Sequence, residues 1–196
     1  MSHRFIIFHK PYGVLSQFTS ELPGQRNLTE FDLPRELYAA GRLDQDSEGL
    51  LLLTNDGPLI QQLLEPGNHE RTYLVQVEGI LTEAARRELE TGVTIQGYQT
   101  LPAKATIVSK EPDLPPRIPS IRVRKSIPTS WIELTLREGK NRQVRRMTAA
   151  VGFPTLRLIR VRIGAIELGT LAEGCWRELT QREVKELKEV RVSIPP

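Results

Sequence analysis

GRLDQDSEGLLLLTNDG, at residues 41–57, joins a loop rich in charge to a run of leucines. The leucines Leu50 to Leu53, with Thr54, have the length and apolar character of a buried strand. Residues 55–58 are asparagine, aspartate, glycine and proline, which are typical of a turn that ends a strand. The preceding loop places two glycines and four charged residues within nine positions, which indicates a tightly folded turn rather than a solvated linker.

Short strands and helices interleave along the rest of the chain without the regular helical crossovers of a parallel sheet. This order is typical of an α+β fold with a largely antiparallel sheet. The patterns predict strands at residues 4–8, 71–77, 104–108, 131–136 and 156–163, and helices at residues 58–64, 82–91 and 141–151 and from residue 180 onward.

The predicted helices carry signals at their ends. Thr82 is the expected N-cap of the second helix, and Gly92 stands where its C-terminal cap belongs. Asn141 is expected to cap the third helix, and the sequence TQRE at residues 180–183 is a capping box for the last one. Five prolines between residues 111 and 128 predict a long irregular connection.

The distribution of charge is uneven, although the net charge of the chain is only +3. Residues 117–162 contain twelve arginines and lysines and two glutamates, a net charge of +10, so the rest of the chain carries −7. Such asymmetry indicates a polyanionic partner, and arginine suits phosphates and flat bases. Nucleic acid is favoured over a membrane, because no strongly apolar helix face accompanies the charge. A solvated basic surface with no partner is the alternative.

The composition excludes several classes of protein. One cysteine, Cys175, rules out an internal disulfide framework, and we expect it to be a small buried residue without chemistry. Three histidines without suitably spaced carboxylates argue against a zinc site, and no metal is predicted. The longest apolar run is far too short to span a bilayer, and the first residues show no signal peptide. We therefore expect a soluble, cytoplasmic protein of 196 residues.

Asp44 is the candidate for chemistry in the charged turn. Because it stands beside Leu43, its carboxylate could lie at the mouth of an apolar pocket, where an arginine would keep it ionised as a nucleophile or base. Loop acids such as Asp44, Asp46 and Glu48 more often cap turns or face water. The residue types alone favour that second interpretation.

Residues 41–57 closely resemble the signature of the RsuA-type pseudouridine synthases, and other motifs of that family occur in the expected order. The resemblance covers nearly the whole chain, and several ordered motifs are far more specific than one short pattern. The further motifs are KPYGV at residues 10–14, RTYLV at 71–75, EGKNRQVRRM at 138–147, LIRVRIG at 158–164 and GCWREL at 174–179.

The resemblance implies an enzyme that isomerises uridine to pseudouridine in RNA without a cofactor. It implies that Asp44 attacks the target nucleotide, at the base or at the sugar. It further implies that Tyr73 packs against the target base and that Arg145 pairs with the catalytic aspartate. Arg146 is the competing candidate for that pairing, since helix boundaries inferred from sequence slip by a few residues.

Other basic residues are candidate RNA contacts. Lys10, Lys140, Arg142 and Arg146 are expected to contact phosphates. Arg42 could bind phosphate, but we favour a salt bridge that braces the catalytic loop. Lys10 and Lys140 could each also be an ordinary exposed lysine.

The family resemblance also predicts the architecture. We expect a single catalytic domain over residues 1–196, made of two α/β subdomains that share a bent, largely antiparallel sheet with the active-site cleft between them. Subdomain A would cover about residues 41–130, and subdomain B about residues 1–40 plus 131–196.

The predicted substrate is 23S ribosomal RNA, because the chain starts at the first catalytic strand and resembles a branch of the family without an S4 RNA-binding domain. A monomer is expected. The alternatives are a non-catalytic RNA-binding or ribosome-assembly factor of the same fold, and a synthase that acts on transfer RNA or 16S ribosomal RNA.

Overall fold

The chain forms two compact units in the computed structural model, which describes residues 3–20, 22–121 and 126–189. The first unit comprises Met1–Glu70 and Arg160–Pro196, and the second comprises Arg71–Ile159. One unit is discontinuous in sequence, as in the predicted subdomains, but the divisions fall after residues 70 and 159 rather than near 40 and 130. The leucine strand at residues 48–54 pairs with the N-terminal strand and so belongs to the first unit. The strand at residues 129–136, after the proline-rich connection, pairs with the strand at residues 71–78 and with the strand at residues 104–108, so all three belong to the second unit.

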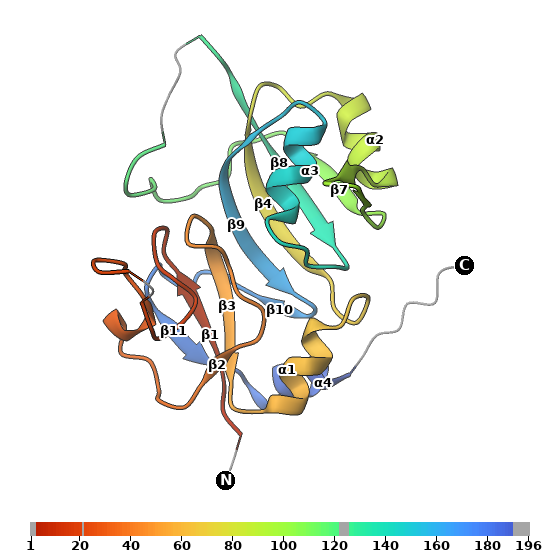
Figure 1. The fold of residues 1–196 in the computed structure, drawn as a ribbon. Coiled ribbons are helices and arrows are strands. Elements are labelled where there is room, and N and C mark those ends of the chain that lie inside the picture. Colours follow the sequence, from red (N-terminus) through yellow and green to blue (C-terminus); the bar gives the residue numbers. More distant parts are fainter. Residues whose placement is uncertain (1–2, 21, 122–125, 190–196) are drawn as a thin grey trace. The chain divides into compact units, whose positions relative to one another are not determined.

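The elements follow the predicted order closely (Figure 1). The strands are β1 (Phe5–Lys10), β2 (Tyr38–Ala39), β3 (Glu48–Thr54), β4 (Arg71–Glu78), β5 (Thr94–Ile95), β6 (Tyr98–Gln99), β7 (Lys104–Val108), β8 (Thr129–Leu136), β9 (Thr155–Ile163), β10 (Ile166–Glu167) and β11 (Trp176–Glu178), and the helices are the 3-10 helix η1 (Leu28–Glu30), α1 (Gly57–Leu64), α2 (Glu83–Thr91), α3 (Gln143–Ala150) and α4 (Gln181–Lys188).

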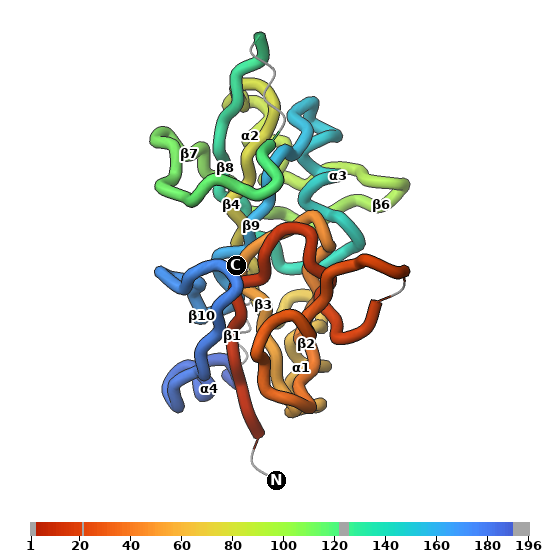
Figure 2. Tube along the Cα trace, turned by 90° about the vertical axis from the view of Figure 1, so that its left-hand side faces the viewer, coloured from red at the N-terminus to blue at the C-terminus, as the bar shows by residue number. Residues whose placement is uncertain are grey.

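The first unit is built on β1, which pairs antiparallel with β3 on one side and with β11 on the other. Figure 2 shows β1 and β3 side by side, and their register places Ile7 opposite Leu52. Every residue of β3 is buried, which confirms the predicted core strand. Phe8 and Leu51 belong to the apolar cluster of this unit, and Leu28 of η1 packs in the same cluster.

The second unit is built on β8, which pairs antiparallel with both β4 and β7. Ile132 and Leu134 of β8 are buried, as are Val75 and Val77 of β4. Helix α2 packs on β7, and Figure 1 shows α3 lying across β4 and β8. The sheet of this unit therefore has one face that helices cover.

The predicted helix ends are confirmed at α2 and α4. Thr82 accepts the hydrogen bond of an N-cap, and Gly92 has a φ of 95° at the C-terminal end of α2. A side chain at Gly92 would meet the carbonyl oxygen of Thr100 at 2.4 Å, so glycine is needed there for space as well as for conformation. The capping box of Thr180 and Glu183 is complete at the start of α4.

The predicted cap of the third helix is wrong. Arg142, with a left-handed φ of 51°, occupies the N-cap position and forms no side-chain capping bond. The Asn141 side chain instead accepts a hydrogen bond from Arg146 at 2.8 Å. The helix therefore starts one position later than predicted, and the Gln143 side-chain oxygen accepts from the backbone N–H of Lys140 in the preceding turn.

Cys175 is exposed, so the expectation that it is buried is also wrong. It lies immediately before β11, in a turn where its backbone bonds to His9 and Ala172.

Within residues 3–20, 22–121 and 126–189, no helix is long and apolar enough to cross a membrane. The same residues contain no group of three or more histidine, cysteine, aspartate or glutamate side chains that could hold a metal ion.

Candidate functional site

The loop that carries Asp44 is held by hydrogen bonds from the segment after β1. The Ser16 hydroxyl donates to the carbonyl of Leu43 at 2.7 Å and accepts from the Leu43 N–H at 3.0 Å. Gly13 donates its N–H to the carbonyl of Gln45 at 2.8 Å. The residues on both sides of half-buried Asp44 are therefore fixed to a neighbouring loop, as a positioned nucleophile requires.

Lys10 lies underneath this loop and is fully buried. Its ammonium donates to the carbonyls of Pro11 at 2.8 Å, Val14 at 2.7 Å and Gln45 at 3.4 Å. Burial lowers the pKa of Lys10 from 10.5 to about 7, although the nearby carboxylate of Glu48 partly offsets this effect. A phosphate contact needs an exposed cation, so the predicted role of Lys10 in RNA binding is wrong. The residue holds the Asp44 loop in place.

Arg160 supports the ends of the same loop and was missed as a site residue. It lies on β9, is buried, and donates to the carbonyl of Leu50 at 2.8 Å and of Gly41 at 3.0 Å. Residues 41 and 50 flank the charged turn, so one guanidinium fastens both of its ends. Nothing in the sequence separates Arg160 from its basic neighbours, because the pairing spans 110 or more residues.

Arg42 is exposed, and its guanidinium donates to the Gln17 side-chain oxygen at 3.5 Å rather than to an acid. Within the described part of the chain it forms no ion pair, so the favoured interpretation as a salt-bridged brace is wrong. A guanidinium that reaches solvent beside the Asp44 loop fits the alternative role, a phosphate contact.

Tyr73 lies on β4 in the second unit, opposite Leu134 of β8. It is 9% exposed and shares its face of the strand with Val75 and Val77. In the described ranges its hydroxyl makes no hydrogen bond. An aromatic ring at the edge of burial with an uncommitted hydroxyl suits contact with a base, since tyrosine combines a flat face with a polar end.

The basic motif at residues 138–147 forms the turn before α3 and the helix itself. Arg145 is half-buried on α3, whereas Arg142 is exposed at its N-terminal end. Arg146, the competing candidate for pairing with Asp44, donates a hydrogen bond to the Asn141 side chain in the turn before the helix. Arg145 and Arg146 thus have different surroundings on the helix.

Lys140 is fixed by a small network in this motif. Its ammonium lies 4.5 Å from the centre of the Tyr98 ring, and the Tyr98 hydroxyl donates to the buried carboxylate of Glu138 at 2.6 Å. Glu138 also accepts from the side chain of Gln143 at 2.6 Å and from the backbone N–H of Leu101 at 2.8 Å. The exposed ammonium is therefore presented from a rigid turn.

The basic segment is less available to a partner than its net charge suggests. Arg157 is 6% exposed and Arg160 is 2% exposed, and both donate to backbone carbonyls. Three other cations of the segment, Arg122, Arg124 and Lys125, lie outside the described residues. The +10 count therefore overstates the charge that the described residues can bring to RNA.

Among the predicted site residues, Lys10, Arg42 and Asp44 belong to the first unit, and Lys10 is joined to the Asp44 loop through Gln45. The second unit contains Tyr73 and the basic residues of the α3 motif, Lys140, Arg142, Arg145 and Arg146.

Comparison with known proteins gives consistent results. Residues 4–150 match the family model of RNA pseudouridylate synthases. The chain is 51% identical, over 92% of its length and 97% of the relative, to the ribosomal large subunit pseudouridine synthase E of Xanthomonas campestris. It is 50% identical to the protein of the same name in Vibrio vulnificus, over 90% of this chain and 75% of that protein.

A solved pseudouridylate synthase has the same fold. It superposes with a TM-score of 0.78 at 30% identity, over 95% of this chain and 74% of that one.

Proposed function

Because this chain belongs to the RNA pseudouridylate synthase family, we propose that it converts a specific uridine of 23S ribosomal RNA to pseudouridine. Family membership makes the chain an isomerase of RNA, and the names of the relatives support the large ribosomal subunit as the source of the substrate. The observation that carries the proposal is the loop around Asp44, whose sequence matches the family signature and whose backbone is fastened by Ser16, Gly13 and Arg160.

The reaction exchanges one bond to the sugar for another. The bond between carbon 1′ of the ribose and nitrogen 1 of uracil breaks, and a bond between carbon 1′ and carbon 5 forms. The hydrogen on carbon 5 leaves as a proton, and nitrogen 1 gains a proton, so that substrate and product are isomers and no cofactor is consumed. Asp44 is the nucleophile in this proposal, with attack on the base or on the sugar left as the two routes.

Tyr73 and Arg145 have separate roles in the proposal. Tyr73 offers its ring to the flipped uracil, and its hydroxyl can help to remove the proton from carbon 5. Arg145 is the proposed partner of the Asp44 carboxylate, as the family resemblance implies. The bond from Arg146 to Asn141 supports this choice between the two arginines.

Accessible cations would hold the RNA backbone. Arg42, Lys140 and Arg142 are exposed, and Arg146 is half-buried. Removal of a single phosphate-binding cation should reduce the dependence of log affinity on log salt by about one unit. Arg142→Gln should therefore lower this slope, and an unchanged slope would exclude Arg142 as a phosphate contact.

Release of tritium from RNA labelled at carbon 5 of uridine tests the reaction directly. Unmodified 23S, 16S and transfer RNA would be compared, with Asp44→Asn as the control that retains the shape of the side chain. Release from 23S RNA alone, absent in the variant, is the expected result. Release from another RNA would refute the proposed substrate, and binding without release from any RNA would favour a ribosome-assembly factor. We further propose that the protein is a monomer that acts in the bacterial cytoplasm. Sedimentation of the purified protein would test the oligomeric state.

A further inference from the structure

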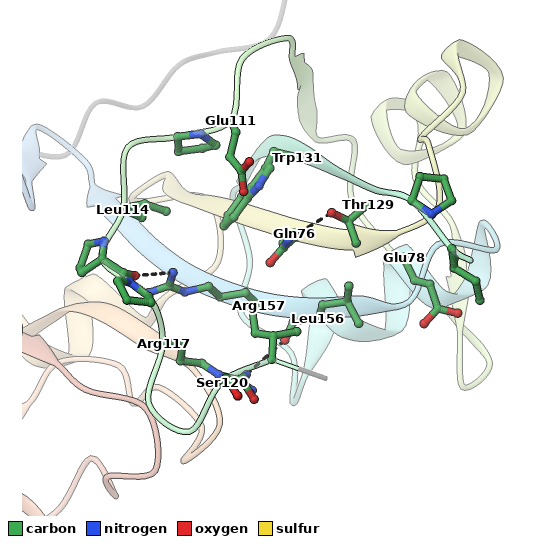
Figure 3. Close-up of a pocket in the computed structure, with 16 residues that line it drawn as sticks. Gln76, Glu78, Glu111, Leu114, Arg117, Ser120, Thr129, Trp131, Leu156 and Arg157 are labelled. Carbon is green, nitrogen blue, oxygen red and sulfur yellow. Dashed lines mark hydrogen bonds between the residues drawn. The ribbon is translucent and has the colours of Figure 1, made fainter. Parts of the chain in front are cut away.

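A pocket of about 630 Å³ lies in the second unit, on the strands β4, β8 and β9 (Figure 3). Its floor includes Gln76, Trp131 and Arg157, and the proline-rich segment at residues 111–121 forms its wall. The volume is within the range that binds small organic ligands. No residue of the proposed catalytic set lines it.

The pocket opens on a different face of the sheet from Tyr73. Gln76 is the cross-strand neighbour of Trp131, so both side chains project from the same face. Tyr73 is three positions from Gln76 on β4, and side chains alternate along a strand, so Tyr73 projects from the opposite face. A nucleotide in this pocket is therefore not the nucleotide that contacts Tyr73.

Trp131 gives the pocket an unmatched hydrogen-bond donor. The residue is 6% exposed, and its indole N–H has no acceptor among the residues that the structure describes. Figure 3 shows its ring extending from β8 toward Glu111 and the proline-rich segment. A buried donor without an acceptor is costly, so an entering ligand that offers a carbonyl or ring nitrogen gains more there than at an ordinary surface.

The remaining polar groups of the pocket suit a nucleotide better than a simple anion. The guanidinium groups of Arg117 and Arg157 line it, and both donate to backbone carbonyls, Arg157 to Pro115 at 3.0 Å. The carboxylates of Glu78 and Glu111 line it as well, which opposes an inorganic anion. A nucleobase carries acceptors for the indole N–H and donors for carboxylate or amide oxygens, and its phosphate can meet a guanidinium.

We propose that this pocket binds an unpaired nucleotide of the RNA other than the target uridine. The inference rests on the proposed function for its choice of RNA as the ligand. Arg117, which is part of the irregular segment, meets the phosphate, and the base lies against Trp131 and Gln76. Such a pocket would hold a displaced nucleotide from another part of the RNA and so add to recognition without taking part in the reaction.

Tryptophan fluorescence provides a local probe, because the chain has only two tryptophans, Trp131 and Trp176. In a Trp176→Phe background, the emission of Trp131 would be followed while oligoadenylate, and separately the 23S fragment, is added. A saturable change in emission with both RNAs is expected. No change with either RNA would overturn the proposal, whatever the tritium assay shows. The same titration in an Asp44→Asn protein should give an equal response, which separates this pocket from the catalytic aspartate.

Steady-state kinetics provide the second test. Trp131→Phe retains an aromatic ring but removes the N–H, and Arg117→Gln removes the charge. Each should raise KM for the RNA about three- to tenfold with little change in kcat. Arg87→Gln, at an exposed position on α2 in the same unit, is the matched control and should leave KM unchanged. Equal KM values in all three variants would overturn the proposal, and thermal unfolding of each variant would confirm that it is folded.

Discussion

Replacement of Lys10 by methionine tests whether a buried ammonium supports the Asp44 loop. Methionine has a similar length and no charge, so it fills the space but leaves the carbonyls of Pro11 and Val14 without their short hydrogen bonds. Each missing bond costs about 1–3 kcal/mol when the acceptor stays buried. Removal of a charge from a buried site restores several kcal/mol, so the two effects largely offset each other near neutral pH.

The pH dependence of stability separates these two contributions. The folded protein holds the pKa of Lys10 at about 7 because the ammonium is buried, against 10.5 for the ordinary group. Between these values the unfolded chain binds a proton that the folded chain has released, so the stability of the wild type rises with pH. The rise is at most about 1.4 kcal/mol per pH unit, and it starts at about pH 7. Lys10→Met lacks this contribution.

Urea denaturation of both proteins at intervals between about pH 6 and about pH 9 measures the difference. As the pH rises above about 7, the free energy of unfolding of the wild type should increase relative to that of Lys10→Met. Lys185→Met removes one positive charge from the solvent-facing side of α4 and serves as the control. A constant difference between wild type and Lys10→Met over the whole range would refute the reasoning, because the ammonium would then titrate alike in both states.

Three further changes have direct structural consequences. Glu183→Gln should destabilise the protein by about 1 kcal/mol at neutral pH, because the Arg177 hydrogen bond lowers the pKa of Glu183 to about 2. In urea denaturation, the difference in free energy of unfolding between wild type and variant should shrink as the pH falls below about 4.5 toward 2. Leu52→Ala, at a fully buried position of β3, should cost about 2–5 kcal/mol in urea denaturation, and a cost under about 1 kcal/mol would contradict its place in the core. Gly92→Ala should lower the thermal midpoint, because its Cβ would meet the Thr100 carbonyl at 2.4 Å; an unchanged midpoint would show that the turn relaxes freely.

Local sequence patterns were sufficient for most elements of the fold. The strand β3 and the helix α2 were predicted because their signals, an apolar run between turn residues and a Thr82 to Gly92 pair of caps, lie within a few positions of each other. The start of α3 was predicted too early. Asparagine is a strong N-cap by type, but its oxygen is engaged by Arg146. The hydrogen bond from Arg146 to Asn141 forms only in the folded turn, so the sequence alone cannot predict it.

The site shows the same division between local and distant information. Family resemblance identified Asp44, but the cations that fix its loop were misjudged, because sequence presents Lys10 and Arg160 as positive charges like any others. Their burial follows from tertiary structure. Lys10 donates to the carbonyls of Val14 and Gln45, and Arg160 donates to those of Gly41 and Leu50, so both cations satisfy backbone acceptors around the Asp44 loop. A basic residue in an RNA-binding protein can therefore serve the loop rather than the RNA, and charge counts over a segment cannot separate the two. Arg160→Met should accordingly impair turnover without lowering the salt dependence of RNA binding, whereas Arg142→Gln should do the reverse.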